Sequence, residues 1–208
     1  MRESTARGDV LGWFESLYSQ ANDSAEAIQW ADQVVNPYLQ RWLAARCSGK
    51  GRALDVGCGL GDNAAALVAA GYAVTAFDIS PTAVAWAQRR FPTLPISWHV
   101  ANVLGLPSNW LRAFDLVAEV YTLQVLPPPE RRLTMQALAS AVADQGTLLV
   151  ICRGREPLDP PGEMPWPLTI EELQYFESLG LRRETFEEVF DDEVPPVRRF
   201  VVTYRRSS

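Results

Sequence analysis

A turn with three glycines at alternate positions is the segment of this sequence best suited to hold a ligand. It reads Ala-Leu-Asp-Val-Gly-Cys-Gly-Leu-Gly over residues 53–61. Glycine adopts positive φ without strain, and its missing Cβ lets a ligand approach the backbone. The third glycine comes one residue earlier than in the G-x-G-x-x-G fingerprint of dinucleotide-binding proteins. The segment therefore predicts a ligand loop, and other residues must indicate which ligand it holds.

A carboxylate follows the next apolar segment of the chain. Asp78 lies 17 residues after Gly61, directly after the apolar stretch 73–77. At the tip of a strand beside the glycine loop, such a carboxylate can accept hydrogen bonds from both ribose hydroxyls of an adenosine. Ile79 would then lie against the adenine ring. The two segments together predict a site for an adenosine-containing ligand.

The glycine loop and Asp78 can meet only if a parallel sheet places them at one edge. Short apolar segments rich in β-branched and aromatic residues are typical of strands covered on both faces, and they occur at residues 53–56, 73–77, 96–100, 115–120 and 147–152. Helical stretches separate them at residues 63–70, 81–90 and 129–142. This alternation predicts an α/β fold with right-handed crossovers.

The N-terminal part of the chain has a helical pattern. Residues 9–47 have apolar side chains at helical spacing, and Asn36 followed by Pro37 is typical of a helix start. We therefore divide the chain into an N-terminal helical lid over residues 1–48 and a ligand-binding part over residues 49–208. The two parts are expected to pack as one structural domain, because the length suits a single α/β domain.

The C-terminal part follows a proline-rich loop over residues 156–167. Thr169 and a glutamate three residues later have the spacing of a capping box, which predicts a helix over residues 169–179. Two consecutive strands, 184–190 and 198–205, are then expected to form a hairpin at one edge of the sheet.

Composition argues against several kinds of chemistry. The formal net charge is -6, and an acidic surface repels phosphate backbones, so we expect no nucleic-acid partner. His99 is the one histidine, which argues against a two-histidine metal site and a Ser-His-Asp triad. We therefore expect no metal and interpret His99 as a structural residue of an apolar strand. Lys50, the one lysine, fits neither a phosphate-binding loop nor a Tyr/Lys dehydrogenase pair.

The sequence also predicts where the protein works. No apolar run approaches the ~20 residues that a membrane span requires, so no membrane partner is expected. The 3 cysteines are scattered without C-x-x-C spacing, which favours a reducing cytoplasm over a disulfide framework. We therefore expect a cytoplasmic protein, and both a monomer and a homodimer are compatible with the sequence.

Taken in order, four segments resemble successive motifs of class I S-adenosylmethionine-dependent methyltransferases: residues 53–61, 77–80, 101–107 and 114–127. The tail, with Trp-Pro-Leu-Thr before its helix, is similar to small bacterial members related to thiopurine and tellurite methyltransferases. The resemblance implies a Rossmann-like, seven-stranded, mostly parallel sheet with helices on both faces and an antiparallel C-terminal strand.

The same resemblance implies a site for S-adenosylmethionine, with S-adenosylhomocysteine as product. The glycine loop would surround the methionine part and Asp55 would order that loop. Asp78 would hold the ribose, Ile79 would pack on the adenine, and Val103 with Asn102 would meet the adenine amino edge. Many members have Asp in place of this Asn. The implied cofactor-binding residues are Asp55, Gly57, Cys58, Gly59, Gly61, Asn63, Asp78, Ile79, Ser80, Asn102, Val103, Leu104 and Glu119.

Methyl transfer makes few demands on catalytic side chains. It is an in-line displacement driven by the cofactor, and the protein must hold the nucleophile about 3 Å from the methyl group and exclude water. An acceptor that is already ionised, such as a thiolate, requires no base. Where a base is required, Glu119 and Tyr121 are the candidates, because both end the fourth strand.

The acceptor site is expected to form from the N-terminal helices and the proline-rich loop, since the sheet serves the cofactor. Its candidate residues are aromatic or basic: Trp13, Phe14, Tyr18, Trp30, Tyr121 and Arg153. The aromatic residues of the N-terminal part are equally compatible with packing against the sheet. Arg153 and Arg155 would either meet an anionic acceptor or pair with the acidic tail. The acceptor is expected to be a small molecule, with a thiol or another soft nucleophile as one candidate, because an acceptor that needs no base suits a chain with one histidine.

Three other functions remain compatible with the sequence. A binding module could have kept the S-adenosylmethionine pocket and lost turnover. A nicotinamide- or flavin-dependent oxidoreductase would share the fold, although the glycine spacing argues against it. A protein or nucleic-acid methyltransferase is disfavoured by the net acidity and by the lack of a recognition domain.

Overall fold

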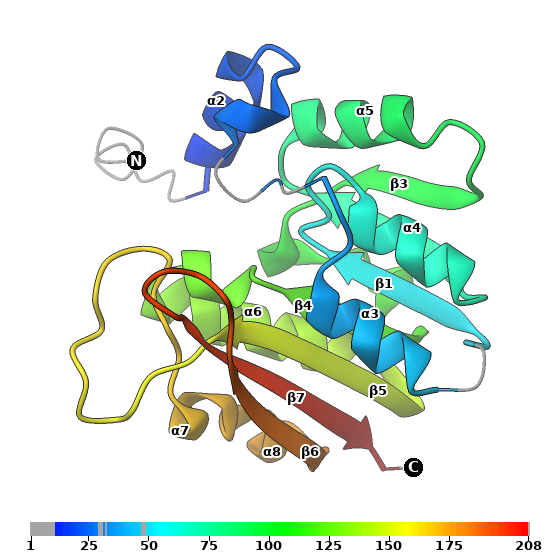
Figure 1. Ribbon diagram of the computed structural model, residues 1–208. Coiled ribbons are helices and arrows are strands. Elements are labelled where there is room, and N and C mark those ends of the chain that lie inside the picture. The colour runs from blue at the N-terminus through cyan, green and yellow to red at the C-terminus, as the bar shows by residue number, and fades with distance from the viewer. Residues whose placement is uncertain (1–10, 29–30, 32, 47–48, 208) are drawn as a thin grey trace.

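The computed structural model describes residues 11–28, 31, 33–46 and 49–207, and it has a seven-stranded sheet between layers of helices (Figure 1). The strands are β1 (Arg52–Val56), β2 (Ala73–Asp78), β3 (Ile96–Val100), β4 (Phe114–Val120), β5 (Val142–Arg153), β6 (Leu181–Phe190) and β7 (Arg198–Arg206). The α-helices are α2 (Trp13–Gln20), α3 (Pro37–Ala44), α4 (Asp62–Ala69), α5 (Pro81–Arg90), α6 (Pro128–Ala141), α7 (Ile170–Leu173) and α8 (Tyr175–Ser178). The short 3-10 helices are η1 (Ala25–Ala27), η2 (Val103–Gly105), η3 (Ser108–Trp110) and η4 (Leu123–Val125).

The strand order is β3-β2-β1-β4-β5-β7-β6, which confirms the predicted fold class. The first five strands in this order are parallel, and β7 runs antiparallel between β5 and β6. The chain returns across the sheet between β1 and β4, where ligands of open α/β sheets bind. Val56 pairs with Phe77 on one side and with Glu119 on the other. The residues that follow these three therefore lie next to one another.

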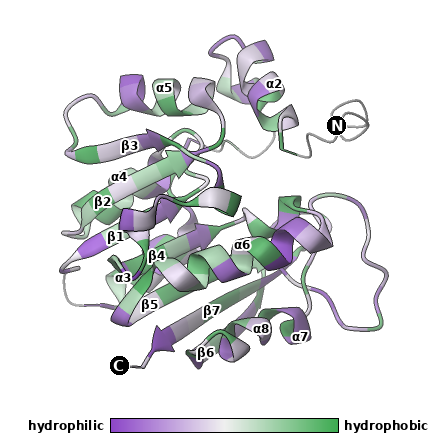
Figure 2. Cartoon of the chain, turned by 180° about the vertical axis from the view of Figure 1, so that it is seen from behind, coloured by the Kyte–Doolittle hydropathy of each residue, from purple (hydrophilic) through white to green (hydrophobic). Residues whose placement is uncertain are grey.

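Two hydrophobic layers hold the helices on the sheet. On one face, α3 and α4 contribute Leu39, Trp42 and Leu67 to a buried cluster with β1, β2 and β4. On the other face, α6, α7 and α8 form the larger cluster, which includes Phe176 and Tyr204. Figure 2 shows these three helices across that face, with hydrophobic colouring along the central strands behind them. Each central strand is therefore covered on both sides, as its apolar sequence predicts.

The N-terminal region contains two short helices with different packing. Helix α2 and η1 pack on α5 through a small cluster that includes Tyr18 and Trp86. Helix α3 instead belongs to the sheet layer, because Trp42 Nε1 donates a hydrogen bond to Thr203 Oγ1 of β7 at 2.9 Å. Asn36 caps α3 as predicted, accepting from two backbone N–H groups. The predicted helical pattern over residues 9–47 is wrong for the described chain between η1 and α3, which is not helical.

Strand β3 departs from its prediction as a strand covered on both faces. It is the edge strand, so Val100 is 55% exposed and His99 is also exposed. The His99 ring lies 2.8 Å from Ser97 Oγ and edge-on to Trp110. The interpretation of His99 as part of an apolar, buried strand is therefore wrong, because an edge strand has a neighbour on only one side.

The C-terminal part agrees with the sequence in its caps and its hairpin. Thr169 and Glu172 form the predicted capping box. The predicted helix over residues 169–179 is divided into α7 and α8 at Gln174. The hairpin of β6 and β7 closes the sheet edge, with β7 inserted beside β5. Among the residues described, no helix is long and apolar enough to cross a membrane.

Candidate functional site

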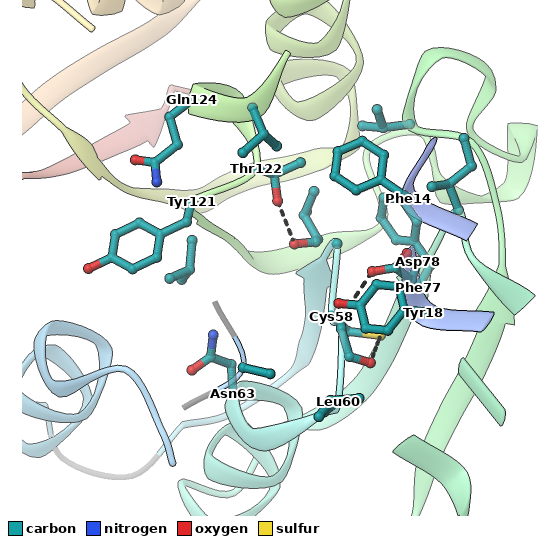
Figure 3. A pocket seen from close by; sticks show the side chains of 18 of the residues that line it. Phe14, Tyr18, Cys58, Leu60, Asn63, Phe77, Asp78, Tyr121, Thr122 and Gln124 are labelled. Carbon is teal, nitrogen blue, oxygen red and sulfur yellow. Dashed lines mark hydrogen bonds between the residues drawn. The ribbon is translucent and has the colours of Figure 1, made fainter. Parts of the chain in front are cut away.

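A pocket opens at the carboxyl ends of β1, β2 and β4, beneath α2 (Figure 3). Its walls come from the glycine loop, the tips of β2 and β4, η4, the segment before α3 and the proline-rich loop. The residues predicted for the site that line it are Phe14, Tyr18, Gly57, Cys58, Gly59, Asn63, Asp78, Ile79, Val103 and Tyr121. The fold thus brings together predicted residues that lie far apart in the sequence.

The glycine loop has the backbone that its sequence predicts. Gly57, Gly59 and Gly61 have φ values of +61°, +50° and +89°. A Cβ on Gly57 would lie 2.6 Å from Thr122 Oγ1, and one on Gly61 would lie 2.6 Å from the Trp98 ring. These two glycines are therefore required by packing. Gly59 lines the pocket, and a Cβ there would meet the Tyr18 hydroxyl at 3.0 Å.

Helix α4 begins directly after this loop and points its first turn at the pocket. Gly61 is the N-cap residue and has no side chain, and the Asp55 carboxyl accepts a hydrogen bond from the Ala64 N–H in the first turn. Backbone N–H groups at such a start lack intrahelical partners and favour an anionic ligand group. Asn63 lines the pocket from the first turn, and its Oδ1 accepts a hydrogen bond from the Asn36 N–H at 3.0 Å. The start of α4 is thereby tied to the segment before α3.

Asp78 is the charged group that joins the loop to the next strand. Its Oδ2 accepts a hydrogen bond from the Gly59 N–H at 3.0 Å and its Oδ1 accepts one from the Ser80 N–H at 2.9 Å. Burial raises the pKa of Asp78, and these backbone donors oppose that rise. The Ile79 N–H also bonds to this carboxylate, which has about four lone-pair sites in all and can therefore still accept from a ligand. This geometry fits a ribose diol, the group that the sequence predicts.

Asp55 is buried behind the loop and does not line the pocket. Burial, together with the charge of Asp78, raises its pKa to about 8, and a hydrogen bond from the Ala64 N–H partly opposes this. Its Oδ2 is buried without a hydrogen-bond partner. The carboxyl connects β1 to α4, which agrees with the predicted role of ordering the loop.

Glu119 also lies behind the pocket wall and does not line it. Its Oε1 accepts hydrogen bonds from the N–H groups of Thr122 and Leu123, at 2.7 and 2.9 Å. Burial raises its pKa to about 7, and its Oε2 has no partner. Its position differs from that expected of a base that touches the acceptor. The carboxyl instead holds the turn after β4, because both of its bonds go to the backbone of that turn.

Tyr121 is the residue that this turn presents to the pocket. It has φ +67°, a conformation that is uncommon for residues other than glycine and is found at functional sites. The Arg199 guanidinium lies 4.9 Å from the centre of its ring. Burial raises the pKa of Tyr121, although the Arg199 charge and a hydrogen bond with Asn36 oppose this. The phenol is therefore protonated at neutral pH and suits hydrogen bonding better than proton abstraction.

Other predicted residues support the pocket from outside its surface. Ser80 is fully buried and caps α5, accepting from the Ala83 N–H at 3.0 Å. Asn102 is exposed, and its Oδ1 accepts from the Leu104 N–H at 2.9 Å. Neither Asn102 nor Leu104 lines the pocket. Only Val103 of this segment faces the pocket, from a buried position.

The predicted acceptor residues divide into those that line the pocket and those that do not. Trp13 stacks on Phe14 with ring centres 4.0 Å apart but does not line the pocket. Arg153 also lies outside it, and its guanidinium is 3.7 Å from Glu193 of the acidic turn. Arg155 donates to carbonyls of its own loop and to Glu172. Arg153 thus pairs with the acidic tail, as the alternative interpretation predicts, whereas Arg155 pairs with Glu172 instead. Trp30 lies outside the described residues.

Several lining residues were missed at the sequence level. They lie on three segments and comprise Gln33, Asn36, Thr122, Gln124, Val125, Leu126, Met164 and Pro165. The proline-rich loop was expected to contribute, and it does so through Met164 and Pro165. Gln124 follows β4 in a Thr-Leu-Gln-Val-Leu segment without a distinctive spacing. Among the residues that the structure describes, no three side chains form a metal-binding group.

Comparison with known proteins agrees with this site. Residues 53–146 match a family described as a methyltransferase domain. A ubiquinone biosynthesis O-methyltransferase of Xanthomonas campestris pv. campestris (strain B100) is 32% identical over 126 residues, covering 59% of this chain and 52% of the relative. The chain therefore spans about half the length of the curated relatives it matches.

Solved structures show the same fold over nearly the whole chain. A 1,6-didemethyltoxoflavin-N1-methyltransferase from Burkholderia thailandensis, with bound S-adenosylhomocysteine, has a TM-score of 0.74 at 19% identity and covers 98% of this chain and 90% of its own. TehB from Haemophilus influenzae has a TM-score of 0.69 at 15% identity and covers 86% and 65%. Residues 53–146 match the methyltransferase domain family, and the fold of the chain is that of these solved methyltransferases.

Proposed function

We propose that this chain binds S-adenosylmethionine in the pocket and transfers its methyl group to a small molecule. The observation that carries the proposal is the pairing of Gly59 with Asp78 beside the start of α4, whose N-cap residue is Gly61. That arrangement offers a carboxylate to a ribose, bare backbone to the methionine part and the N–H groups of the first two residues of α4 to a carboxylate. The bound S-adenosylhomocysteine of the toxoflavin methyltransferase supports the same ligand class.

When bound, S-adenosylmethionine supplies an activated methyl group on a sulfonium sulfur. The chain's own residues then hold the two reactants in line and exclude water. We assign Asp78 to the ribose, Ile79 and Val103 to the adenine, and Gly57 to Gly59 to the methionine part. Tyr18 and Phe14 cover this region from α2.

The proposal needs no side-chain base. The Tyr121 pKa is raised by burial, so its phenol keeps its proton at neutral pH. The Glu119 carboxyl has a suitable pKa of about 7 but bonds to the backbone behind the wall. Catalysis would then depend on placement, with the acceptor's proton lost to solvent. Both residues remain part of the proposal as groups that shape the end of β4.

Calorimetric titration with S-adenosylhomocysteine tests the proposal directly. We expect micromolar binding by the wild type, and at least about tenfold weaker binding by Asp78→Ala, because a buried hydrogen-bonding carboxylate is lost. Asp115→Ala is the matched control. Asp115 also accepts a hydrogen bond from a backbone N–H, that of Arg52, but it lies at the start of β4.

The alternatives predict different titrations. Tight binding of NAD with no binding of S-adenosylhomocysteine would favour the oxidoreductase and contradict the proposal. Binding of S-adenosylhomocysteine with no methyl transfer to any small molecule would favour the non-catalytic module. Equal affinity in Asp78→Ala and the wild type would remove the ribose assignment.

We also propose that α2 and η1 act as the cover of the pocket, whereas α3 belongs to the body of the domain. The packing of α3 on β7 through Trp42 and Thr203 supports this division of the N-terminal region. The location we propose is the cytoplasm. Both described cysteines, Cys58 and Cys152, are free and buried, which is compatible with a reducing compartment.

A further inference from the structure

The wall of the pocket opposite the glycine loop contains one polar side chain with an unused donor. Gln124 lies in η4, directly after the end of β4, and is only 4% exposed. Figure 3 shows its amide on the same wall as Tyr121 and Thr122. Besides these two polar neighbours, the lining near it includes the apolar residues Val125, Leu126 and Met164.

The orientation of this amide is fixed by the backbone. Gln124 Oε1 accepts a hydrogen bond from the Arg153 N–H at 2.6 Å. A backbone N–H can only donate, so the oxygen must face Arg153 and the NH₂ group must face the other way. Among the described residues, no group accepts a hydrogen bond from Gln124 Nε2. The backbone of Gln124 is fixed too, because its carbonyl accepts from the Trp166 N–H at 2.7 Å.

The charges of the lining limit which molecules can bind against this wall. Among the described lining residues, the ionisable side chains are carboxyls, phenols and a thiol. None of these residues is Arg, Lys or His. Asp62 is paired with Arg90 at 2.6 Å, and Asp78 faces the glycine loop. A carboxylate or phosphate on the acceptor would therefore lose its hydration without gaining a basic partner.

Two arginines behind this wall face the acidic turn between β6 and β7. Arg199, beneath the Tyr121 ring, is buried and pairs with Asp191 at 2.6 Å and also with Glu193. Arg153 lies 3.7 Å from Glu193, and its buried Nε has no hydrogen-bond partner. The acidic turn between β6 and β7 thus occupies the positive charges that an anionic acceptor would need.

We infer that Gln124 is a specificity-determining residue: its amide donates a hydrogen bond to an oxygen of a largely apolar methyl acceptor that has no permanent anionic group. The inference rests on the proposed function, since it names the class of acceptor for that same pocket. A hydroxyl or carbonyl oxygen on an apolar ring fits the combination of one fixed donor and apolar walls. Carboxylated, phosphorylated and oxyanionic acceptors do not fit it.

A matched set of acceptors tests the charge requirement. The protein is saturated with S-adenosylhomocysteine and titrated with the methyl esters of protocatechuic, vanillic and salicylic acid, and with the corresponding free carboxylates. We expect the neutral esters to bind, and each ester to bind at least about tenfold more tightly than its carboxylate. The reason is that the carboxylate would be a buried polar group without a partner. Equal or tighter binding of the carboxylates, or of tellurite, overturns the inference. Binding by no neutral member overturns it as well.

The variant Gln124→Glu tests the donor itself. One carboxylate oxygen can still accept from the Arg153 N–H, so the turn keeps its bond, but the other oxygen now presents an acceptor to the pocket. The titration is made at pH 9, where a carboxyl with a pKa raised by burial is ionised, and with methyl salicylate, the ester of the set whose internally hydrogen-bonded phenol stays largely protonated at that pH. We expect the affinity for this ester to fall about tenfold or more while S-adenosylhomocysteine binds as in the wild type.

Gln136→Glu is the matched control, because Gln136 is an exposed glutamine on α6 that bonds to Tyr175. It should bind both ligands as the wild type does. Unchanged affinity of Gln124→Glu for methyl salicylate overturns the inference and leaves the proposed function intact. Failure of the wild type to bind S-adenosylhomocysteine contradicts the proposed function instead, so the two failures are distinguishable.

Discussion

Three buried carboxyls lie at or behind the walls of the pocket: Asp55, Asp78 and Glu119. Asp78 faces the pocket, whereas Asp55 and Glu119 lie behind its walls and bond to backbone N–H groups. Each of the latter two leaves one oxygen without a partner. Because a buried carboxylate without full hydrogen bonding is costly, the neutral form of these groups is favoured in the folded state.

The substitution Asp55→Asn should make stability less dependent on pH. Burial raises the pKa of Asp55 from 3.8 to about 8, so the folded protein holds a proton that the unfolded chain releases. The free energy of unfolding therefore falls as pH rises from about 4 to about 8. Asn cannot ionise but can still accept from the Ala64 N–H. Thermal unfolding from pH 5 to pH 9 should show a flatter slope in Asp55→Asn, and the wild-type slope in Asp115→Asn.

A slope in Asp55→Asn equal to that of the wild type would show that Asp55 is already ionised in the folded state. Glu119, with a pKa of about 7, contributes the remaining slope over a lower range of pH. Both groups act in the same direction, so the ligand-free protein should be more stable in mild acid than in mild alkali.

For single residues, the sequence predicts the position of a side chain where that position depends only on neighbouring residues in the chain. The glycines and Asp78 follow their strands directly, so the strand pattern places them in the pocket. Glu119 and Asn102 were expected to face ligands, but each bonds to the backbone of its own turn. Side-chain direction at a strand end depends on the turn that follows, and no spacing rule gives it. Gln124 was missed for the same reason.

Helix α2 is the element that covers the pocket, and a single carboxylate fixes it. The Glu15 carboxylate accepts hydrogen bonds from Ser80 Oγ at 2.5 Å and from Thr82 Oγ1 at 2.6 Å. It also accepts one from the Thr82 N–H at the start of α5, where the helix dipole favours a negative charge. Burial raises the pKa of Glu15, but these hydrogen bonds outweigh it and lower the pKa overall.

Removal of this contact should loosen the cover without unfolding the sheet. In Glu15→Ala, we expect faster hydrogen exchange in α2 and S-adenosylhomocysteine binding weakened about threefold to tenfold, because several hydrogen bonds are lost. Glu26→Ala is the control, since Glu26 is an exposed residue of η1 in the same N-terminal region. Unchanged exchange in α2 would mean that apolar packing on Trp86 is sufficient to hold it.

Among the elements, the alternating part of the chain and the C-terminal hairpin were predicted correctly, whereas the burial of β3 and the packing of the N-terminal helices were not. Strands β1, β2, β4 and β5 and the helices between them follow the expected order. Strand β3 is exposed because it lies at the sheet edge, and strand order cannot be read from apolar content. The sequence does not show that the N-terminal helices pack differently, because only the tertiary contacts of α3 show that it packs on β7.

Over the whole molecule, helix α3 from the N-terminal part of the chain and strand β7 from the C-terminal part are joined across one face of the sheet. The hydrogen bond between Trp42 and Thr203 connects residues 161 positions apart, and it is buried. The N-terminal segment therefore stabilises the hairpin of β6 and β7, which lies farthest from β3 in the sheet.

A double-mutant cycle measures this connection. Trp42→Phe and Thr203→Val each remove one partner of the hydrogen bond while keeping most of the packing volume. We expect each to lower the free energy of unfolding, with a coupling of about 1 kcal/mol between them by urea denaturation. Strictly additive effects would show that the contact contributes packing alone.

The Tyr18 hydroxyl above Gly59 has a consequence for turnover. On the proposed function, a ligand seated on the glycine loop lies beneath Tyr18 of α2, and we expect its release to require that the Glu15 contact with α5 opens. Product departure then becomes the slow event, and the first turnover of a rapid-mixing experiment should appear as a burst followed by a slower steady rate. Loosening the roof should shrink the burst and raise the steady rate, so that a weaker binder becomes a faster enzyme.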